Sequence, residues 1–150
     1  MVKKTNRTIG CGLAFVIIGF AAAQMASFEE FTAAIEEYQL TGYRMSIALA
    51  LTLIALEICS VPFLLGLSVQ RKAMRIASAA CVVLVPALWA ILTILVLVSG
   101  VDAMNAGYLG GFAKTSVTGA VLVFDLVWLA VAGFAFRALG GVATVRHFLR

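Results

Sequence analysis

The sequence predicts an all-α membrane protein: a single-domain, polytopic four-helix bundle with a short amphipathic helix between spans one and two. Hydrophobic residues make up 63% of the 150 residues and charged residues only 12%, whereas a soluble domain carries about 25% charged residues. Four apolar stretches stand near residues 8–25, 45–69, 76–99 and 117–136. Each approaches or exceeds the roughly 20 residues that a helix needs to cross a bilayer core of about 30 Å.

The basic residues indicate how this bundle is oriented. Nine of the eleven lie on one side of the four-span arrangement: Lys3, Lys4, Arg7, Arg71, Lys72, Arg75, Arg137, Arg146 and Arg150. The positive-inside rule places that side, with both termini and the tail 137–150, in the cytoplasm. We therefore expect a multi-pass protein of the cell inner membrane that contacts lipid. The net charge of +4 follows from this topology, and no nucleic-acid partner is expected.

The first span and the segment after it come next in the chain. The basic start and the apolar run to Met25 also fit a cleavable signal peptide, but we expect the span to be retained. Residues 27–40 then repeat aromatic and aliphatic side chains at helical spacing, opposite a face of glutamates. Ser27 and Glu30 stand at capping-box spacing. We expect a short helix lying over the outer end of the bundle; the alternative is a solvated connection with an acidic face.

Two carboxylates stand within the later spans. Glu57 lies near the middle of span two, and Asp125 lies in span four, three residues before Trp128. Span three carries Trp89. At 1.5 Å per residue, all four side chains fall about 12–18 Å below the outer surface, which predicts one interior polar layer.

An ionisable side chain at the centre of a membrane costs at least about 2.5 kcal/mol on insertion scales. Such a residue is therefore interpreted first as part of a functional site. A ligand, proton or quinone site is one interpretation of Glu57, and a helix–helix hydrogen bond is the other. No basic residue shares the depth of Glu57 and Asp125. We therefore expect at least one of the two to be protonated at neutral pH. The indole N–H groups of Trp89 and Trp128 are candidate donors to them.

The remaining sequence carries no recognisable catalytic arrangement. The three cysteines, Cys11, Cys59 and Cys81, stand singly inside spans, where a thiol behaves as a small apolar side chain. The only histidine, His147, lies three residues before the last residue. No phosphate loop or metal-spaced cluster is present. We predict no catalytic residues, no metal site and no resident cofactor, with quinone kept open as a ligand.

The first half of the chain carries a pattern of small, aromatic and acidic residues. It reads Arg7-Thr8-Ile9-Gly10, Gly19 with Gln24, Phe28-x-x-Phe31-x-x-x-Ile35-x-x-Tyr38-x-Leu40, Leu56-Glu57 and Leu64-Leu65-Gly66. Over residues 7–66 this pattern resembles the DoxX-like and MauE-type membrane proteins, and the second half resembles them loosely. Members often have a lysine where Gln24 stands. MauE-type members often have a Cys-Gly-Cys-Phe-Gly loop where this chain reads Ala106-Gly107-Tyr108-Leu109-Gly110. Without those thiols, thiol–disulfide exchange has no nucleophile in the loop.

The resemblance implies an accessory protein that supports assembly or maturation of a membrane or periplasmic redox system without chemistry of its own. Such a role requires a protein partner at the outer face, for which we expect contacts from Phe28, Phe31, Tyr38, Arg44 and Tyr108. Two alternatives stay open: a quinone-linked oxidoreductase subunit, and a small proton-coupled transporter that uses the two acids.

Overall fold

Five helices make up most of the described chain, which comprises residues 2–39, 42–67 and 72–141 of the computed structural model. They are α1 (Val2–Ala26), α2 (Phe28–Glu37), α3 (Tyr43–Leu64), α4 (Lys72–Ser99) and α5 (Gly119–Ala138). The described residues contain no strand. Helices α1, α3, α4 and α5 are each long and apolar enough to cross a membrane. The predicted fold class is therefore confirmed.

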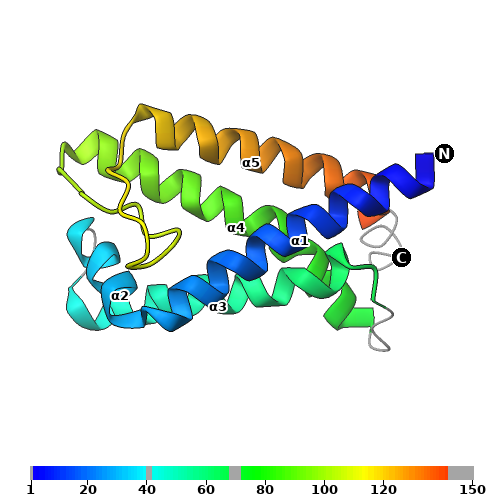
Figure 1. Ribbon diagram of the computed structural model, residues 1–150, viewed down its shortest axis with the longest axis horizontal. Helices are drawn as coiled ribbons and strands as arrows, with labels where there is room; N and C mark the ends of the chain where they lie inside the picture. Colours follow the sequence, from blue (N-terminus) through cyan, green and yellow to red (C-terminus); the bar gives the residue numbers. More distant parts are fainter. Residues whose placement is uncertain (1, 40–41, 68–71, 142–150) are drawn as a thin grey trace.

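The four long helices lie alongside one another, with α2 across one end (Figure 1). Helix α3 packs against α4 and α1, and α4 packs against α5, while α1 and α5 share a smaller contact. The connection 100–118 folds back toward α2 instead of extending away from the bundle (Figure 1). We call α2 together with residues 100–118 the cap. The opposite end of the bundle holds the beginning of α1 and the end of α5.

Both faces of the long helices are apolar. In α4, Val82, Val85 and Trp89 follow one another at helical spacing and are fully buried, whereas Leu84 and Ile91 are exposed. The spacing of three and four residues places the buried set on one side of the helix. A helix that is apolar all round needs an apolar environment outside the bundle as well. The exposed face is therefore suited to contact with membrane lipid.

Helix α3 ends earlier than the apolar run that predicted it. The second span was expected over residues 45–69, but the helix closes at Leu64, and Leu65 is its C-cap. Gly66 follows with φ +65°, a left-handed conformation that glycine adopts without a Cβ penalty. Hydropathy alone did not mark this end, because the turn residues are themselves apolar. Residues 68 and 69 lie outside the described part of the chain.

Helix α1 crosses the end of α3 at close range. Gly10 is buried, and a Cβ built on it would lie 2.6 Å from the backbone carbonyl oxygen of Leu64. Small residues allow helices in a membrane to approach this closely. Gly12, two residues later, has open space at the same position. One glycine of the pair is therefore required by packing and the other is not.

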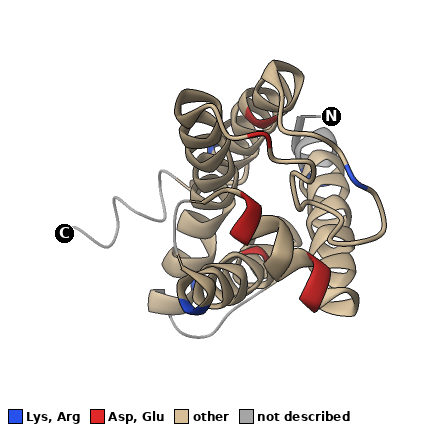
Figure 2. Cartoon of the chain, turned by 90° about the vertical axis from the view of Figure 1, so that its left-hand side faces the viewer, with Lys and Arg blue, Asp and Glu red and all other residues tan. Residues whose placement is uncertain are grey.

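Charged residues separate between the two ends of the bundle. Arg7, Arg75 and Arg137 stand near the beginning of α1, the beginning of α4 and the end of α5. Viewed from the other end, the acidic positions of the cap are prominent (Figure 2). This arrangement matches the charge separation expected from the sequence. Arg71, Arg146, Arg150 and most of the predicted tail 137–150 lie outside the described residues.

Candidate functional site

Glu57 lies on the face of α3 that turns into the bundle, and it is fully buried. Its Oε1 atom accepts hydrogen bonds from Gln24 Nε2 of α1 over 3.3 Å and from Trp89 Nε1 of α4 over 3.2 Å. Among the described residues, its Oε2 atom has no hydrogen-bond partner. One oxygen of this carboxyl group therefore joins three helices, and the other has no protein donor.

Asp125 is the second buried acid, on the inward face of α5. Thr93 Oγ1 of α4 donates to its Oδ2 over 2.7 Å. The Tyr108 hydroxyl, from the loop of the cap, donates to its Oδ1. Both oxygens of Asp125 are thus satisfied by neutral hydroxyl donors, one from the neighbouring helix and one from the loop.

Tyr108 connects the two acids. Gln24 Nε2, which donates to Glu57, also donates to the backbone carbonyl oxygen of Tyr108 over 3.2 Å. The ring of Tyr108 packs against Trp89 with 4.6 Å between centroids. A continuous set of contacts therefore runs from Glu57 through Gln24 and Tyr108 to Asp125. The structure brings the predicted polar layer together, and it adds the cap to that layer.

Trp128 differs from what the sequence predicted for it. Its ring packs edge-on against Phe20 with 5.5 Å between centroids, and it also contacts Tyr108 and Phe124. Its indole Nε1 is buried and has no hydrogen-bond partner within the described chain. The expectation that Trp128 donates to an acid was therefore wrong, because its three-residue spacing from Asp125 fixes a shared face but not the direction of the indole N–H. Trp89 does donate, to Glu57.

Several residues predicted to contact a partner point into the protein instead. Phe31 and Tyr38 are buried; Phe31 packs on Trp89 with 6.3 Å between centroids, and the Tyr38 hydroxyl donates to the Ala106 carbonyl over 2.8 Å. The prediction for these two residues was wrong because the apolar face of α2 packs down on the bundle. Tyr108 is half-buried and directed inward. Phe28 is half-buried, and only Arg44 of the set is exposed.

The cap is held by hydrogen bonds that the capping-box prediction missed. Ser27 precedes α2 but makes no side-chain cap bond to it. Its hydroxyl donates to the Ala23 carbonyl over 2.9 Å and accepts from the Gly111 backbone N–H over 2.8 Å. Gly110 has φ +56°, and a Cβ there would collide with Ser27 Oγ. The serine therefore fastens the loop to α1, which leaves its hydroxyl unavailable for a capping box.

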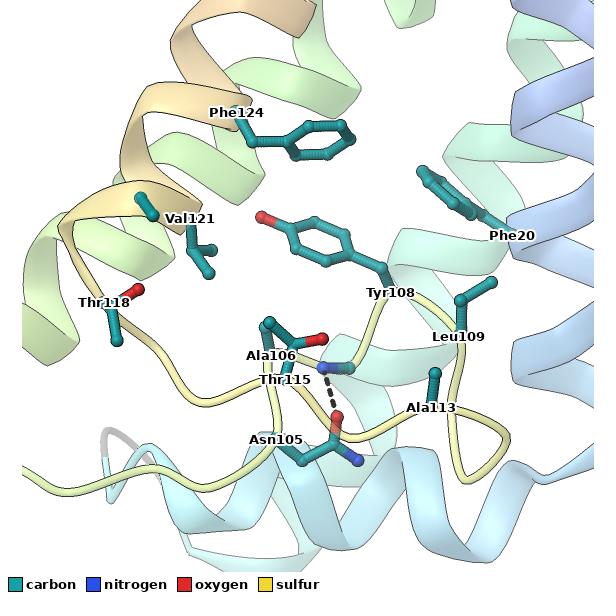
Figure 3. A pocket seen from close by; sticks show the side chains of 12 residues that line it. Phe20, Asn105, Ala106, Tyr108, Leu109, Ala113, Thr115, Thr118, Val121 and Phe124 are labelled. Carbon is teal, nitrogen blue, oxygen red and sulfur yellow. Dashed lines mark hydrogen bonds between the residues drawn. The ribbon is translucent and has the colours of Figure 1, made fainter.

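Asn105 shapes the loop from within. Its Nδ2 donates to the Gly110 carbonyl over 2.9 Å. Its Oδ1 accepts from the Gly107 backbone N–H over 2.9 Å, the bond dashed in Figure 3. Gly107 has φ +80° and lies against Phe31 and Trp89. This local bonding presents Tyr108 toward the interior between α1 and α5. The positive φ angles of Gly107 and Gly110 thus serve to fold the loop inward.

A cavity of about 340 Å³ lies beside this loop. Around the Tyr108 ring, Figure 3 shows Phe124 of α5 above, Phe20 of α1 to the right and Val121 of α5 to the left. The remaining lining comes from the loop and the beginning of α5: Asn105, Ala106, Gly107, Leu109, Ala113, Thr115, Thr118 and Ala120. The lining is predominantly apolar, and the volume is within the usual range for a small-molecule site.

Two residues of this network could have been suspected from the sequence. Thr93 stands one helical turn after Trp89, so it shares the face that carries the predicted donor. Gln24 is a polar residue at the end of an otherwise apolar span. The direction of Tyr108 had no comparable signal. Among the described residues, no group of three or more His, Cys, Asp or Glu side chains is placed to hold a metal ion.

Burial of two tyrosines, Tyr108 in the cap and Tyr38 directly after α2, predicts a loss of stability in alkali. Burial raises the pKa of Tyr108 above its ordinary 10.0, and the hydrogen bond to Asp125 raises it further; burial also raises the pKa of Tyr38. Well below pH 10.0, the ordinary phenol pKa, both phenols are protonated in the folded and in the unfolded protein. The contribution of the two buried phenols to folding stability is then complete. Above pH 10.0 the unfolded phenols lose protons that the folded ones keep. Unfolding is then favoured by up to about 1.4 kcal/mol per pH unit for each phenol.

Thermal unfolding of the purified protein in detergent, measured between about pH 9 and about pH 11, tests this expectation. Tyr108→Phe should reduce the alkaline slope, and the same change at the exposed Tyr43 should leave it unaltered. An equal slope in all three proteins would contradict the assignment of Tyr108.

The chain was also compared with other proteins. No match was found to models of known protein families, to curated proteins or to solved structures.

Proposed function

We propose that this protein is a DoxX- or MauE-like accessory protein that supports assembly or maturation of a redox enzyme through its cap. The observation that carries this proposal is the exposure of large apolar side chains outside the spans. Met104 and Phe112 stand on the loop with 72% and 70% of their surfaces exposed. Exposed apolar side chains on the loop lie outside the spans, so they are available to a protein partner.

The residues of the family-like pattern support the same proposal through their positions. Gly10 meets Leu64, Gln24 meets Glu57, and Phe31 meets Trp89. These contacts join α1 and α2 to α3 and α4, so the pattern coincides with the packing that holds the first half of the bundle. A shared packing pattern supports a shared fold, and function must still be argued from the site.

The cap is suited to bind a partner because hydrogen bonds within the protein already order its loop. The backbone N–H of Met104 donates to Glu37 of α2 over 3.0 Å, in addition to the Ser27 and Gln24 contacts described above. A preordered loop loses less conformational freedom on binding. Met104 and Phe112 therefore replace Phe31, Tyr38 and Tyr108 as the expected partner contacts, while Phe28 and Arg44 are retained.

Photo-crosslinking in the native membrane tests the proposal. A photoreactive phenylalanine analogue replaces Phe112, and the matched control replaces Phe134, which is equally aromatic and exposed on α5. We expect the probe at position 112 to capture a redox enzyme or its subunit, and the probe at 134 to capture lipid. Removal of the whole protein should lower the amount of that enzyme assembled. Capture at 134 alone, or full assembly without this protein, would refute the accessory role.

We further propose that the cap faces the outside of the cell inner membrane. The charge separation between the two ends supports this orientation through the positive-inside rule. A thiol reagent that does not cross membranes should label Glu30→Cys from the outside when Cys11, Cys59 and Cys81 are replaced by alanine. Labelling from the cytoplasmic side alone would reverse the orientation.

A further inference from the structure

The cavity beside Tyr108 lies between two spans at the depth of lipid chains. Phe124 is five residues into α5 and Phe20 is six residues before the end of α1. At 1.5 Å per residue, both rings stand about 7–9 Å below the cap end of their helices. Ala120 and Phe124, which line the cavity on the α5 side, are exposed on the surface of the bundle. The cavity is therefore bordered by the surface that faces lipid.

Two polar side chains of the lining, Tyr108 and Asn105, are already hydrogen-bonded to other groups of the protein. The Tyr108 hydroxyl donates to Asp125, and the Asn105 side chain is bonded within the loop at both its nitrogen and its oxygen. A ligand whose recognition depends on a donor from the wall, such as the carbonyl head of a quinone, finds none offered by these two side chains. Most of the remaining lining is apolar and includes Phe20, Val121 and Phe124, and Thr115 and Thr118 are its other polar side chains.

We propose that this cavity binds one hydrocarbon chain of a membrane lipid from the leaflet on the cap side. An empty apolar cavity leaves the atoms of its lining without dispersion partners, and a lipid chain is the apolar material that lies beside its opening. The chain would enter between Phe20 and Phe124. The ester and head group would stay at the rim, where the loop and the beginning of α5 supply the hydroxyls of Thr115 and Thr118.

The lipid would complete a packing surface that the protein leaves unfinished. Helices α1 and α5 share little direct contact, and Tyr108 fills part of the space between them. A chain in the cavity would contact the same Phe20 and Phe124 rings as Tyr108 does. This inference concerns the cavity alone and does not depend on a redox partner.

Tryptophan fluorescence in vesicles of phosphatidylcholine with brominated chains tests the proposal, because bromine quenches tryptophan at short range. The protein has two tryptophans, both buried, and Trp128 contacts the Phe20 and Phe124 rings that line the cavity. Ala120→Phe should obstruct the cavity and reduce the quenching, because Trp128 contacts Phe20 and Phe124 and Trp89 contacts Tyr108, and all three contacted rings line the cavity. Ala130→Phe adds the same ring at an exposed position of α5 outside the lining and should quench like the unchanged protein.

A second variant and a second measurement keep the test decisive. Ala113→Phe obstructs the cavity from the loop side, so it serves if Ala120→Phe does not fold. Mass spectrometry of the protein released from gentle detergent should show one retained phospholipid, lost in the obstructed variants and kept in Ala130→Phe. Equal quenching in every protein would overturn the proposal, and so would retention of a quinone instead of a phospholipid.

Discussion

Replacing Glu57 by leucine is expected to lower the free energy of unfolding of the bundle by about 1–3 kcal/mol. The change removes the acceptor of Gln24 Nε2 and Trp89 Nε1 while both donors stay in the interior. A buried donor left without an acceptor costs about 1–3 kcal/mol. Interhelical hydrogen bonds in lipid average only about 0.6 kcal/mol, because the unfolded state in the membrane also finds partners. We therefore expect the loss of unfolding free energy in Glu57→Leu to be closer to about 1 kcal/mol than to about 3 kcal/mol.

Glu57→Gln removes the ionisable group and keeps an oxygen that can accept the two hydrogen bonds, so it tests the two roles separately. Its amide oxygen can accept from the same two donors, so its unfolding free energy should stay close to that of the unchanged protein. Cys59→Leu is a matched control, since it introduces leucine at an exposed position two residues away. Unfolding in mixed micelles of increasing denaturing detergent measures all three. Equal stability of Glu57→Leu and Glu57→Gln would show that the two hydrogen bonds do not hold the bundle.

The comparison also separates a structural role from a protonic one. If Glu57 only accepts hydrogen bonds, Glu57→Gln should support the partner enzyme as the unchanged protein does. If the Oε2 atom, which has no partner among the described residues, exchanges a proton in function, Glu57→Gln should fold and fail to support that enzyme. The accessory role proposed above, without chemistry of its own, predicts the first result.

Gly10→Ala is expected to destabilise the bundle by about 1–3 kcal/mol, the usual cost of overpacking. The added methyl group would stand 2.6 Å from the backbone carbonyl oxygen of Leu64 and 3.1 Å from a methyl carbon of Leu139. A backbone atom at the end of a packed helix cannot rotate away as a side chain can. Helix α1 must therefore move off α3, and this displacement would weaken the contact between Gln24 and Glu57.

Gly12→Ala is the control, because its expected effect on the free energy of unfolding is zero or stabilising instead of destabilising. Nothing lies within 4 Å of a Cβ at Gly12, and alanine favours a helix over glycine by up to about 1 kcal/mol in water. Its stability should stay unchanged or rise, as measured by unfolding in the same micelles. Destabilisation of both variants by a similar amount would indicate that helix propensity, and not the approach to α3, decides the outcome.

Much of the fold could be predicted because hydropathy and length act locally. A run of apolar residues such as 76–99 must form its backbone hydrogen bonds internally in lipid, and a helix does this within one segment. The depth of Glu57, Trp89 and Asp125 follows from the fixed rise per residue. Their meeting in one layer was therefore predictable, although the hydrogen bond from Thr93 to Asp125 required the rotation of α4 to be known.

The cap could not be predicted in the same way, because its direction depends on contacts between distant residues. Tyr108 reads as a loop residue, yet Asn105 and the Ser27–Gly111 bond turn it inward. The aromatic face of α2 was visible in the sequence, but periodicity does not say whether that face meets the bundle or a partner. The structure places Phe31 and Tyr38 against the bundle.

The sequence by itself thus determined four helices long and apolar enough to cross a membrane and the positions of two acids along them, because each depends on composition along a single helix. The tertiary structure decided which side chains donate hydrogen bonds to the acids. Gln24 and Trp89 donate to Glu57, and Thr93 and Tyr108 donate to Asp125. The physical reason is that burying a polar group without a hydrogen bond is costly. Partners must therefore be found across helices and loops, in an arrangement that only the packed chain fixes.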